Sequence, residues 1–166
     1  FEWISGIRRN LISLAPVYLF ILAFSFKPYV AVVGLIFLSI LISGFYYNGE
    51  PREFVELFAK NPRDFILRKI LTNLKQLIIL FAPILFQTPT WYYLIIAVIY
   101  SSLIQVLAIV FKYGLFEENA NLNRNSIIVL INIFFVIVPL FWPVPIIMGI
   151  RYYIKACENL KKYIHD

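Results

Sequence analysis

Long apolar stretches dominate the first third of the chain. Residues 11–26 and 29–47 contain no charged side chain, and only Lys27 and Pro28 separate them. A helix of roughly 20 apolar residues crosses the ~30 Å hydrocarbon core of a bilayer. The pattern therefore predicts two transmembrane helices joined by a tight turn.

A second pair of apolar stretches follows after a polar interval. They run over about 70–86 and 91–111, and the short uncharged turn 87–90 joins them. Both are long enough for a membrane span. We therefore expect a second helical hairpin.

The last apolar region, 126–150, contains Pro139, Pro143 and Pro145. Proline lacks a backbone N–H and clashes with the preceding turn, so we expect the helix to break or kink there. Two arrangements remain open. The region crosses the membrane once, with the polar tail 151–166 on the far side, or it breaks and turns back as a hairpin.

Composition agrees with a membrane protein. The chain is 61% hydrophobic and 14% charged, whereas soluble domains are about 45–50% apolar and about 25% charged. A water-soluble chain of 166 residues could not bury that much apolar surface. The sequence thus predicts an all-α polytopic integral membrane bundle, a single domain over 1–166 with five or six transmembrane segments.

The basic residues indicate an orientation, because Lys and Arg of short loops are retained in the cytoplasm. They gather in 1–10, 48–69 and 112–125, whereas Lys27 and the 87–90 turn lie on the other side. The N-terminus is therefore expected on the cytoplasmic side of a bacterial inner membrane. The basic tail, with Arg151, Lys155, Lys161 and Lys162, favours a last region that turns back.

The net charge of +6 does not indicate nucleic acid. The basic residues flank the spans instead of forming a stripe, and attraction to anionic lipid headgroups accounts for them. We therefore expect the lipid bilayer, and no nucleic acid, as a partner.

Candidate chemistry is sparse. The nine carboxylates all lie outside the predicted spans, and proton relays need ionisable groups within them. Cys157 and His165 are each the single residue of their type, so no disulfide or thiol metal cluster is expected. Acid–base pairs, nucleophile triads, metal spacings and phosphate loops are missing. The sequence predicts no enzyme activity and no cofactor, and any energy would come from another polypeptide.

Polar residues nevertheless recur inside the spans. One set is spaced at i, i+3, i+4 and i+7 and shares a helix face, a second lies one turn apart near the middle of the fourth span, and one residue lies in the last region. They could form a seam along a translocation path, or hydrogen bonds between helices that contribute about 0.6 kcal/mol each. These residues are Lys69, Thr72, Asn73, Gln76, Ser101, Gln105 and Asn132.

The segment 50–65 has an amphipathic pattern that suits a membrane surface or a docked partner. Asn61, Pro62 and Asp64 then predict a helix start, with an N-cap, a first-position proline and an acid in the first turn. That helix continues directly into the third span. The candidate docking residues are Arg52, Glu53, Phe54, Leu57, Phe58, Arg63 and Asp64.

The stretch from Arg52 to Leu71 resembles the region after the second span of ATP-binding-cassette export permeases. The first nine residues are similar to the interfacial N-terminal helix of those proteins, and 139–145 to their re-entrant element. The resemblance is concentrated in residues 50–75. It implies a transmembrane transport subunit whose 50–65 segment contacts a cytoplasmic ATPase, together with a second membrane subunit.

Two other functions remain open at this stage. The chain could be a non-catalytic membrane scaffold or accessory subunit of a larger complex. It could also be a lipid-modifying enzyme whose site follows no recognised pattern. The scaffold predicts a partner that is not an ATPase, which separates it from the transport subunit.

Overall fold

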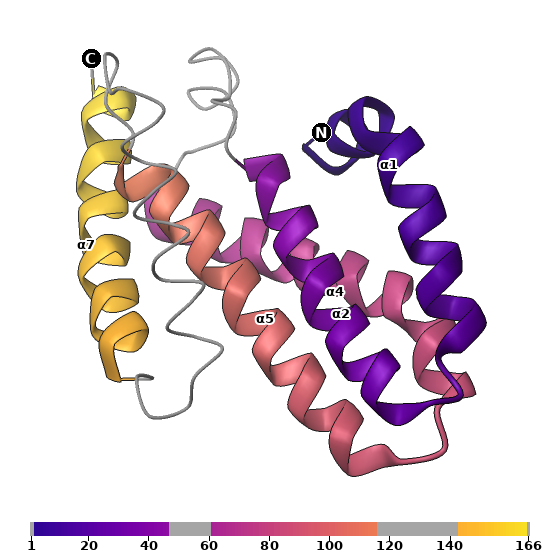
Figure 1. Cartoon of the computed structure of the whole chain (residues 1–166). Helices are drawn as coiled ribbons and strands as arrows, with labels where there is room; N and C mark the ends of the chain where they lie inside the picture. Colours follow the sequence, from indigo (N-terminus) through magenta and orange to yellow (C-terminus); the bar gives the residue numbers. More distant parts are fainter. Residues whose placement is uncertain (1, 47–60, 116–142, 166) are drawn as a thin grey trace. The chain divides into compact units, whose positions relative to one another are not determined.

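A computed structural model describes residues 2–46, 61–115 and 143–165 (Figure 1). Within these residues the chain is helical and no strand occurs, so the predicted all-α class is confirmed. The elements are α1 (Glu2–Phe24), α2 (Pro28–Ser43), the 3-10 helix η1 (Gly44–Tyr46), α4 (Pro62–Gln87), α5 (Trp91–Gly114) and α7 (Pro143–His165).

Four of the described helices are long and apolar enough to cross a membrane. They are the candidate spans Trp3–Phe24, Pro28–Tyr46, Pro62–Gln87 and Trp91–Gly114. Their outward surfaces are apolar as well as their inward ones: Phe20 of α1 and Ile99 of α5, for example, are exposed. Helices that are apolar all round suit a lipid environment, as expected for an integral membrane protein.

Local residues set the helix ends where the sequence predicts them. Both tight turns lie at the expected places, between α1 and α2 and between α4 and α5. At the start of α4, the backbone N–H of Arg63 donates to Asn61 Oδ1 at 3.2 Å. Asn61 Nδ2 in turn donates to Asp64 Oδ2 at 3.2 Å. The predicted cap is therefore confirmed, and α4 begins well before the apolar stretch at 70.

The last described helix, α7, runs across the boundary between the predicted span 126–150 and the predicted tail 151–166. Residues 116–142, which include Pro139 and Asn132, lie outside the described residues. Pro143 and Pro145 fall in the first turn of α7, where a missing N–H breaks no helical bond. The helix then continues past Ile150, where the sequence predicted a span to end. The reason is that Arg and Lys in the following residues favour helix.

The chain forms two compact units, residues 1–45 with 73–105 and residues 46–72 with 106–166. In the first unit each helix contacts two others. A Cβ on Gly34 of α2 would lie 2.5 Å from Ile21 of α1, so these helices pack closely. The Tyr18 hydroxyl of α1 donates to the carbonyl of Leu80 of α4 at 3.0 Å. Hydrogen bonds described below link α4 to α5 and α5 to α2.

α1 is bent. Its Trp3 and Tyr18 both bond to α4, at Asn73 and Leu80. At about 1.5 Å per residue, a straight α1 would separate its two residues by about twice the distance between the two on α4. The first turns of α1 indeed lie at an angle to the rest (Figure 1). α1 contains Pro16, and a proline inside a helix favours a bend because its ring clashes with the carbonyl four residues earlier.

The second unit joins the start of α4, the end of α5 and α7. The Phe65 ring meets the Tyr113 ring edge to face, with centroids 5.6 Å apart. Asn159 Nδ2 of α7 donates to the carbonyls of Tyr113 and Gly114 at 3.3 and 3.2 Å. These bonds satisfy carbonyls at the end of α5 that have no helical partner. Burial raises the pKa of the Tyr153 phenol of α7 above its ordinary value.

Candidate functional site: a buried amide network

Three hydrogen bonds run through the interior of the first unit. Trp3 Nε1 donates to Asn73 Oδ1 at 2.8 Å, and Asn73 Nδ2 donates to Gln105 Oε1 at 3.1 Å. Gln105 Nε2 then donates to the backbone carbonyl of Ser39 at 2.6 Å. We call Trp3, Asn73, Gln105 and Ser39 the amide network. Its members come from α1, α4, α5 and α2, so it links all four helices of the unit.

The amide network is shielded from solvent. Asn73 is 2% exposed, Gln105 is fully buried and Trp3 is 8% exposed. A buried polar group without a partner costs about 1–3 kcal/mol, so these bonds are needed to keep amides in an apolar interior. One helical turn before Gln105, the buried Ser101 hydroxyl donates to the carbonyl of Leu35 at 3.4 Å. The polar contacts thus follow the α2–α5 boundary.

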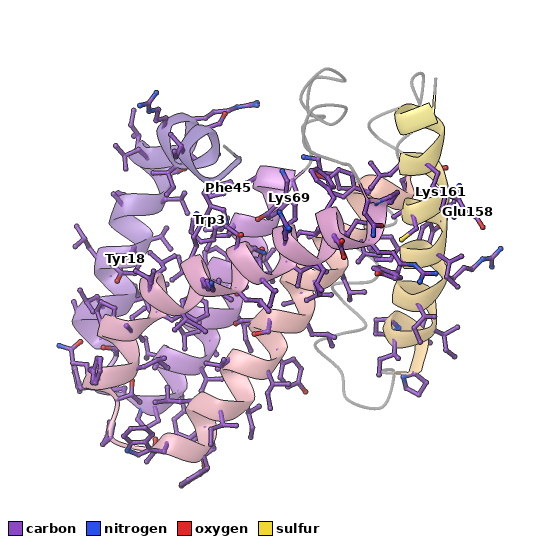
Figure 2. The ribbon with its side chains drawn as sticks, turned by 180° about the vertical axis from the view of Figure 1, so that it is seen from behind. Trp3, Tyr18, Phe45, Lys69, Glu158 and Lys161 are labelled. Carbon is purple, nitrogen blue, oxygen red and sulfur yellow. The ribbon has the colours of Figure 1, made fainter. Side chains whose placement is uncertain are left out.

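Small side chains and an aromatic pair shape the network. The Trp3 ring packs edge to face on Phe45, with centroids 6.0 Å apart (Figure 2). A Cβ on Gly6 would overlap the Phe45 ring, so the glycine lets this ring lie against α1. Ser39 is fully buried, and its short side chain lets Gln105 reach the α2 backbone. Its Oγ has no hydrogen-bond partner among the described residues.

The predicted polar seam is divided by the structure. Asn73, Ser101 and Gln105 lie together in the interior of the first unit. Thr72 is exposed, although it adjoins Asn73, and Gln76 is half-buried. Lys69 belongs to the second unit, where its Nζ lies 5.5 Å from the centroid of the Phe65 ring. The four α4 residues share one broad face, of which the edge that carries Asn73 turns inward. Asn132 lies outside the described residues.

Sequence reasoning missed Trp3. The available signal was chemical, because a buried indole N–H usually has a hydrogen-bond partner. Trp3 was not recognised because it lies at the start of the chain, in a stretch that resembles an interfacial helix. Ser39 is equally hard to recognise from the sequence, because its backbone carbonyl, and not its side chain, makes the contact.

The two hairpin turns are bonded to each other at the other end of the same unit. The Ser25 hydroxyl lies 2.5 Å from Gln87 Oε1 and 2.8 Å from the carbonyl of Leu22, and can donate to either. The Thr88 hydroxyl lies 2.9 Å from the Ser25 carbonyl and 2.8 Å from that of Ile84, and can donate to either. We call Ser25, Gln87 and Thr88 the turn clasp. The hairpins are therefore joined by polar contacts at the amide network and at the turn clasp, and the Tyr18–Leu80 and Ser101–Leu35 bonds lie between them.

The candidate docking residues are only partly described. Arg52, Glu53, Phe54, Leu57 and Phe58 lie outside the described residues. Arg63 and Asp64 are exposed in the first turn of α4, and the next residue, Phe65, is buried against Tyr113. The Nζ of Lys112 lies 5.9 Å from the centroid of the Tyr46 ring and 5.5 Å from that of Tyr113. The first turn of α4 is thus anchored on one side and open on the other.

The amide network can bind and position, but its side chains do not ionise near neutral pH and hence cannot relay protons as acids or bases. Among the described residues, no group of three or more His, Cys, Asp or Glu could hold a metal ion. No protein-family model matches the chain, and no curated protein or solved structure gives a significant match.

Proposed function

We propose that this chain is the membrane-spanning, permease-like subunit of a transporter energised by a separate cytoplasmic ATPase. The observation that carries the proposal is the continuity of α4. This single helix begins in the exposed turn with Arg63 and Asp64, and it also carries Asn73 of the amide network. Rigid helices transmit displacement between sites. A push on the first turn of α4 would therefore act on buried polar contacts.

The start of α4 supports docking to a partner. Arg63 and Asp64 present opposite charges on an exposed turn, and the contact of Phe65 with Tyr113 anchors the same turn. A helix turn that is held in place by packing and that also exposes charged side chains suits a contact that must transmit force. The resemblance to ATP-binding-cassette export permeases over 50–75 names the partner class, and it also implies a second membrane subunit.

The amide network supports a role in which α4 and α5 move relative to each other. Each of its bonds crosses between two helices, so a relative shift of α4 and α5 must exchange the Asn73–Gln105 bond for another polar contact. Such bonds contribute only about 0.6 kcal/mol on average within membranes, which permits exchange. In this proposal the N-terminus and the start of α4 lie on the cytoplasmic side of a bacterial inner membrane.

Site-specific crosslinking tests the ATPase contact. A photoreactive amino acid replaces Arg63 or Asp64 in the full chain, expressed in its own host. Matched controls carry it at Lys27 or Pro89, which are equally exposed but lie in the two hairpin turns. We expect an adduct with a P-loop ATPase from 63 and 64 and none from 27 and 89. Adducts only with proteins that lack a P-loop would refute the proposal.

A second variant tests the neighbouring segment. Replacing Phe54, Leu57 and Phe58 by Asp should abolish co-purification with the ATPase identified by crosslinking. Intact binding of that ATPase to the triple variant would remove the segment from the docking surface.

The scaffold remains the second candidate, and one observation favours it. The side-chain amides of Asn73 and Gln105 already bond to each other, which is what static helix–helix attachment requires. The two functions differ in the double variant Asn73→Leu and Gln105→Leu. A transport subunit should lose transport while the complex still assembles, whereas a scaffold should keep its full function once assembled.

A further inference from the structure

α7 changes character along its length. From Pro143 to Ile150 it carries no charged residue, and from Arg151 onwards it carries Arg151, Lys155, Glu158, Lys161 and Lys162. A helix that is apolar at one end and charged at the other matches the boundary between hydrocarbon and headgroups. The boundary on α7 falls between Ile150 and Arg151.

An exposed isoleucine column crosses this boundary. Ile147 is 64% exposed and Ile154 is 54% exposed. They are seven residues apart and so share a helix face. Arg151 lies between them on that face and is also exposed. Exposed apolar side chains therefore lie on both sides of Arg151. Their exposure to water would be unfavourable, which suggests that lipid covers this face.

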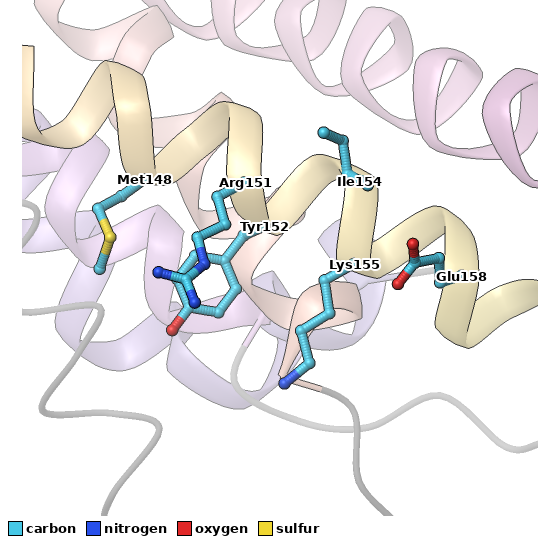
Figure 3. A pocket seen from close by; sticks show the side chains of 6 residues that line it. All are labelled: Met148, Arg151, Tyr152, Ile154, Lys155 and Glu158. Atoms are coloured by element: carbon cyan, nitrogen blue, oxygen red, sulfur yellow. The ribbon is translucent and has the colours of Figure 1, made fainter.

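A hollow lies beside this column (Figure 3). Its volume is about 460 Å³, and its lining combines apolar and charged side chains of α7: Met148, Arg151, Tyr152, Ile154, Lys155 and Glu158. Arg151 and Lys155 are one turn apart, and their side chains extend to the same side of the helix (Figure 3). Two cations at this spacing can both reach one phosphate group.

We propose that α7 binds one anionic phospholipid, with its phosphate held by Arg151 and Lys155. One acyl chain lies along Ile147, on the apolar side of the boundary. The lining sets two cations against the single carboxylate of Glu158, and this balance favours a headgroup with one negative charge over a polyanionic one. Phosphatidylglycerol has this chemistry. The site needs no ATPase, so it stands apart from the proposed transport function.

Lipid retention by the purified full chain tests the site. The protein in a neutral detergent is incubated with phosphatidylglycerol, and bound lipid is counted by native mass spectrometry. The variant Arg151→Gln with Lys155→Gln removes both cations and should weaken binding about 25-fold, from about fivefold per cation. The matched control Arg8→Gln with Arg9→Gln removes two exposed cations from α1 and should bind as the unchanged protein does.

Two further arms identify the ligand. Ile147→Ser should weaken retention of the lipid, because it removes an acyl contact and no charge. Millimolar inorganic phosphate should not displace the lipid. Circular dichroism confirms that each variant keeps its helices. Equal retention by the two double variants, or displacement by inorganic phosphate alone, would overturn the site. Loss of ATPase crosslinks at Arg63 would leave it untouched.

Discussion

Asn73 donates a hydrogen bond to Gln105 across the α4–α5 hairpin, at 3.1 Å and out of reach of solvent. The two residues lie at matching depths on antiparallel helices, and each has a second partner. Trp3 donates to Asn73, while Gln105 donates to the Ser39 carbonyl. Through these two further bonds, the Asn73–Gln105 pair ties the second hairpin to both helices of the first.

A double-mutant cycle should detect this contact. Asn73→Leu and Gln105→Leu are each expected to lower the free energy of unfolding, because each leaves a buried amide without one partner. Their coupling energy should be about 0.6 kcal/mol and no more than about 1.7. Unfolding in mixed micelles with increasing dodecyl sulfate measures it.

The control cycle pairs Gln105→Leu with Thr72→Val. Thr72 adjoins Asn73 but is exposed, so this coupling should be zero within error. Equal coupling in both cycles would show that Asn73 and Gln105 do not act as a pair.

The sequence predicted helix ends better than helix contacts, for a physical reason. Ends depend on local residues: Asn61 caps α4 directly, and Pro28 starts α2. Contacts depend on which face of a helix turns inward. A membrane helix is apolar on its lipid face as well as its inner face, so hydropathy does not mark the difference. The spacing therefore grouped Thr72 with Asn73, although only Asn73 is buried.

Long-range partners were beyond the sequence for the same reason. Trp3 and Asn73 are 70 residues apart, and nothing in either local pattern says that α1 and α4 are neighbours. At the last helix the sequence indicated a break or kink near Pro143 and Pro145, and the structure places both in the first turn of α7, a position that suits proline as well as a break does. Proline indicates that a helix changes there but does not say whether it stops or starts.

The turn between α4 and α5 contains two threonines that can be compared, Thr88 of the turn clasp and Thr90 outside it. Thr88→Val should lower the free energy of unfolding by about 1 kcal/mol, because its hydroxyl bonds to backbone carbonyls. Thr90→Val makes the same change two residues away, where the buried hydroxyl has no partner among the described residues. That variant should be neutral or stabilising. The same unfolding assay compares them, and a Thr90 variant less stable than the Thr88 variant would contradict the clasp.

Gly6 should control the docking of Trp3. In Gly6→Ala the added methyl group overlaps the Phe45 ring, so the first turns of α1 must shift and Trp3 must leave Asn73. Acrylamide quenching of Trp3 fluorescence measures this in a background with Trp91→Phe and Trp142→Phe. We expect quenching to increase at least twofold, because the indole is nearly buried in the unchanged protein.

Two controls accompany the Gly6 variant. Gly149→Ala places its methyl group 3.0 Å from the end of the Leu107 side chain, which can move, so Trp3 quenching should not change. Adding Phe45→Leu to Gly6→Ala should restore part of the protection by making room for the methyl group. Unchanged quenching in Gly6→Ala would mean that the Phe45 ring moves aside without displacing Trp3.

Single-cysteine labelling should place the exposed turns on opposite sides of the membrane. In a Cys157→Ser background, cysteines replace Arg8, Arg63, Lys27 or Pro89, all of which are exposed. Four spans and the retention of basic loops in the cytoplasm predict that 8 and 63 react with an impermeant maleimide only in inverted vesicles. Positions 27 and 89 should react only in intact cells.

The labelling also limits the proposed function. A cytoplasmic ATPase can reach Arg63 and Asp64 only if the start of α4 lies on its side of the membrane. Labelling of 8 and 63 from opposite sides would mean that α1 and α2 do not both cross, and the two-hairpin membrane topology would fail. Labelling of 63 from outside together with 8 would keep the four spans but exclude the ATPase contact. The scaffold would then be the function that remains, because it requires no cytoplasmic energy source.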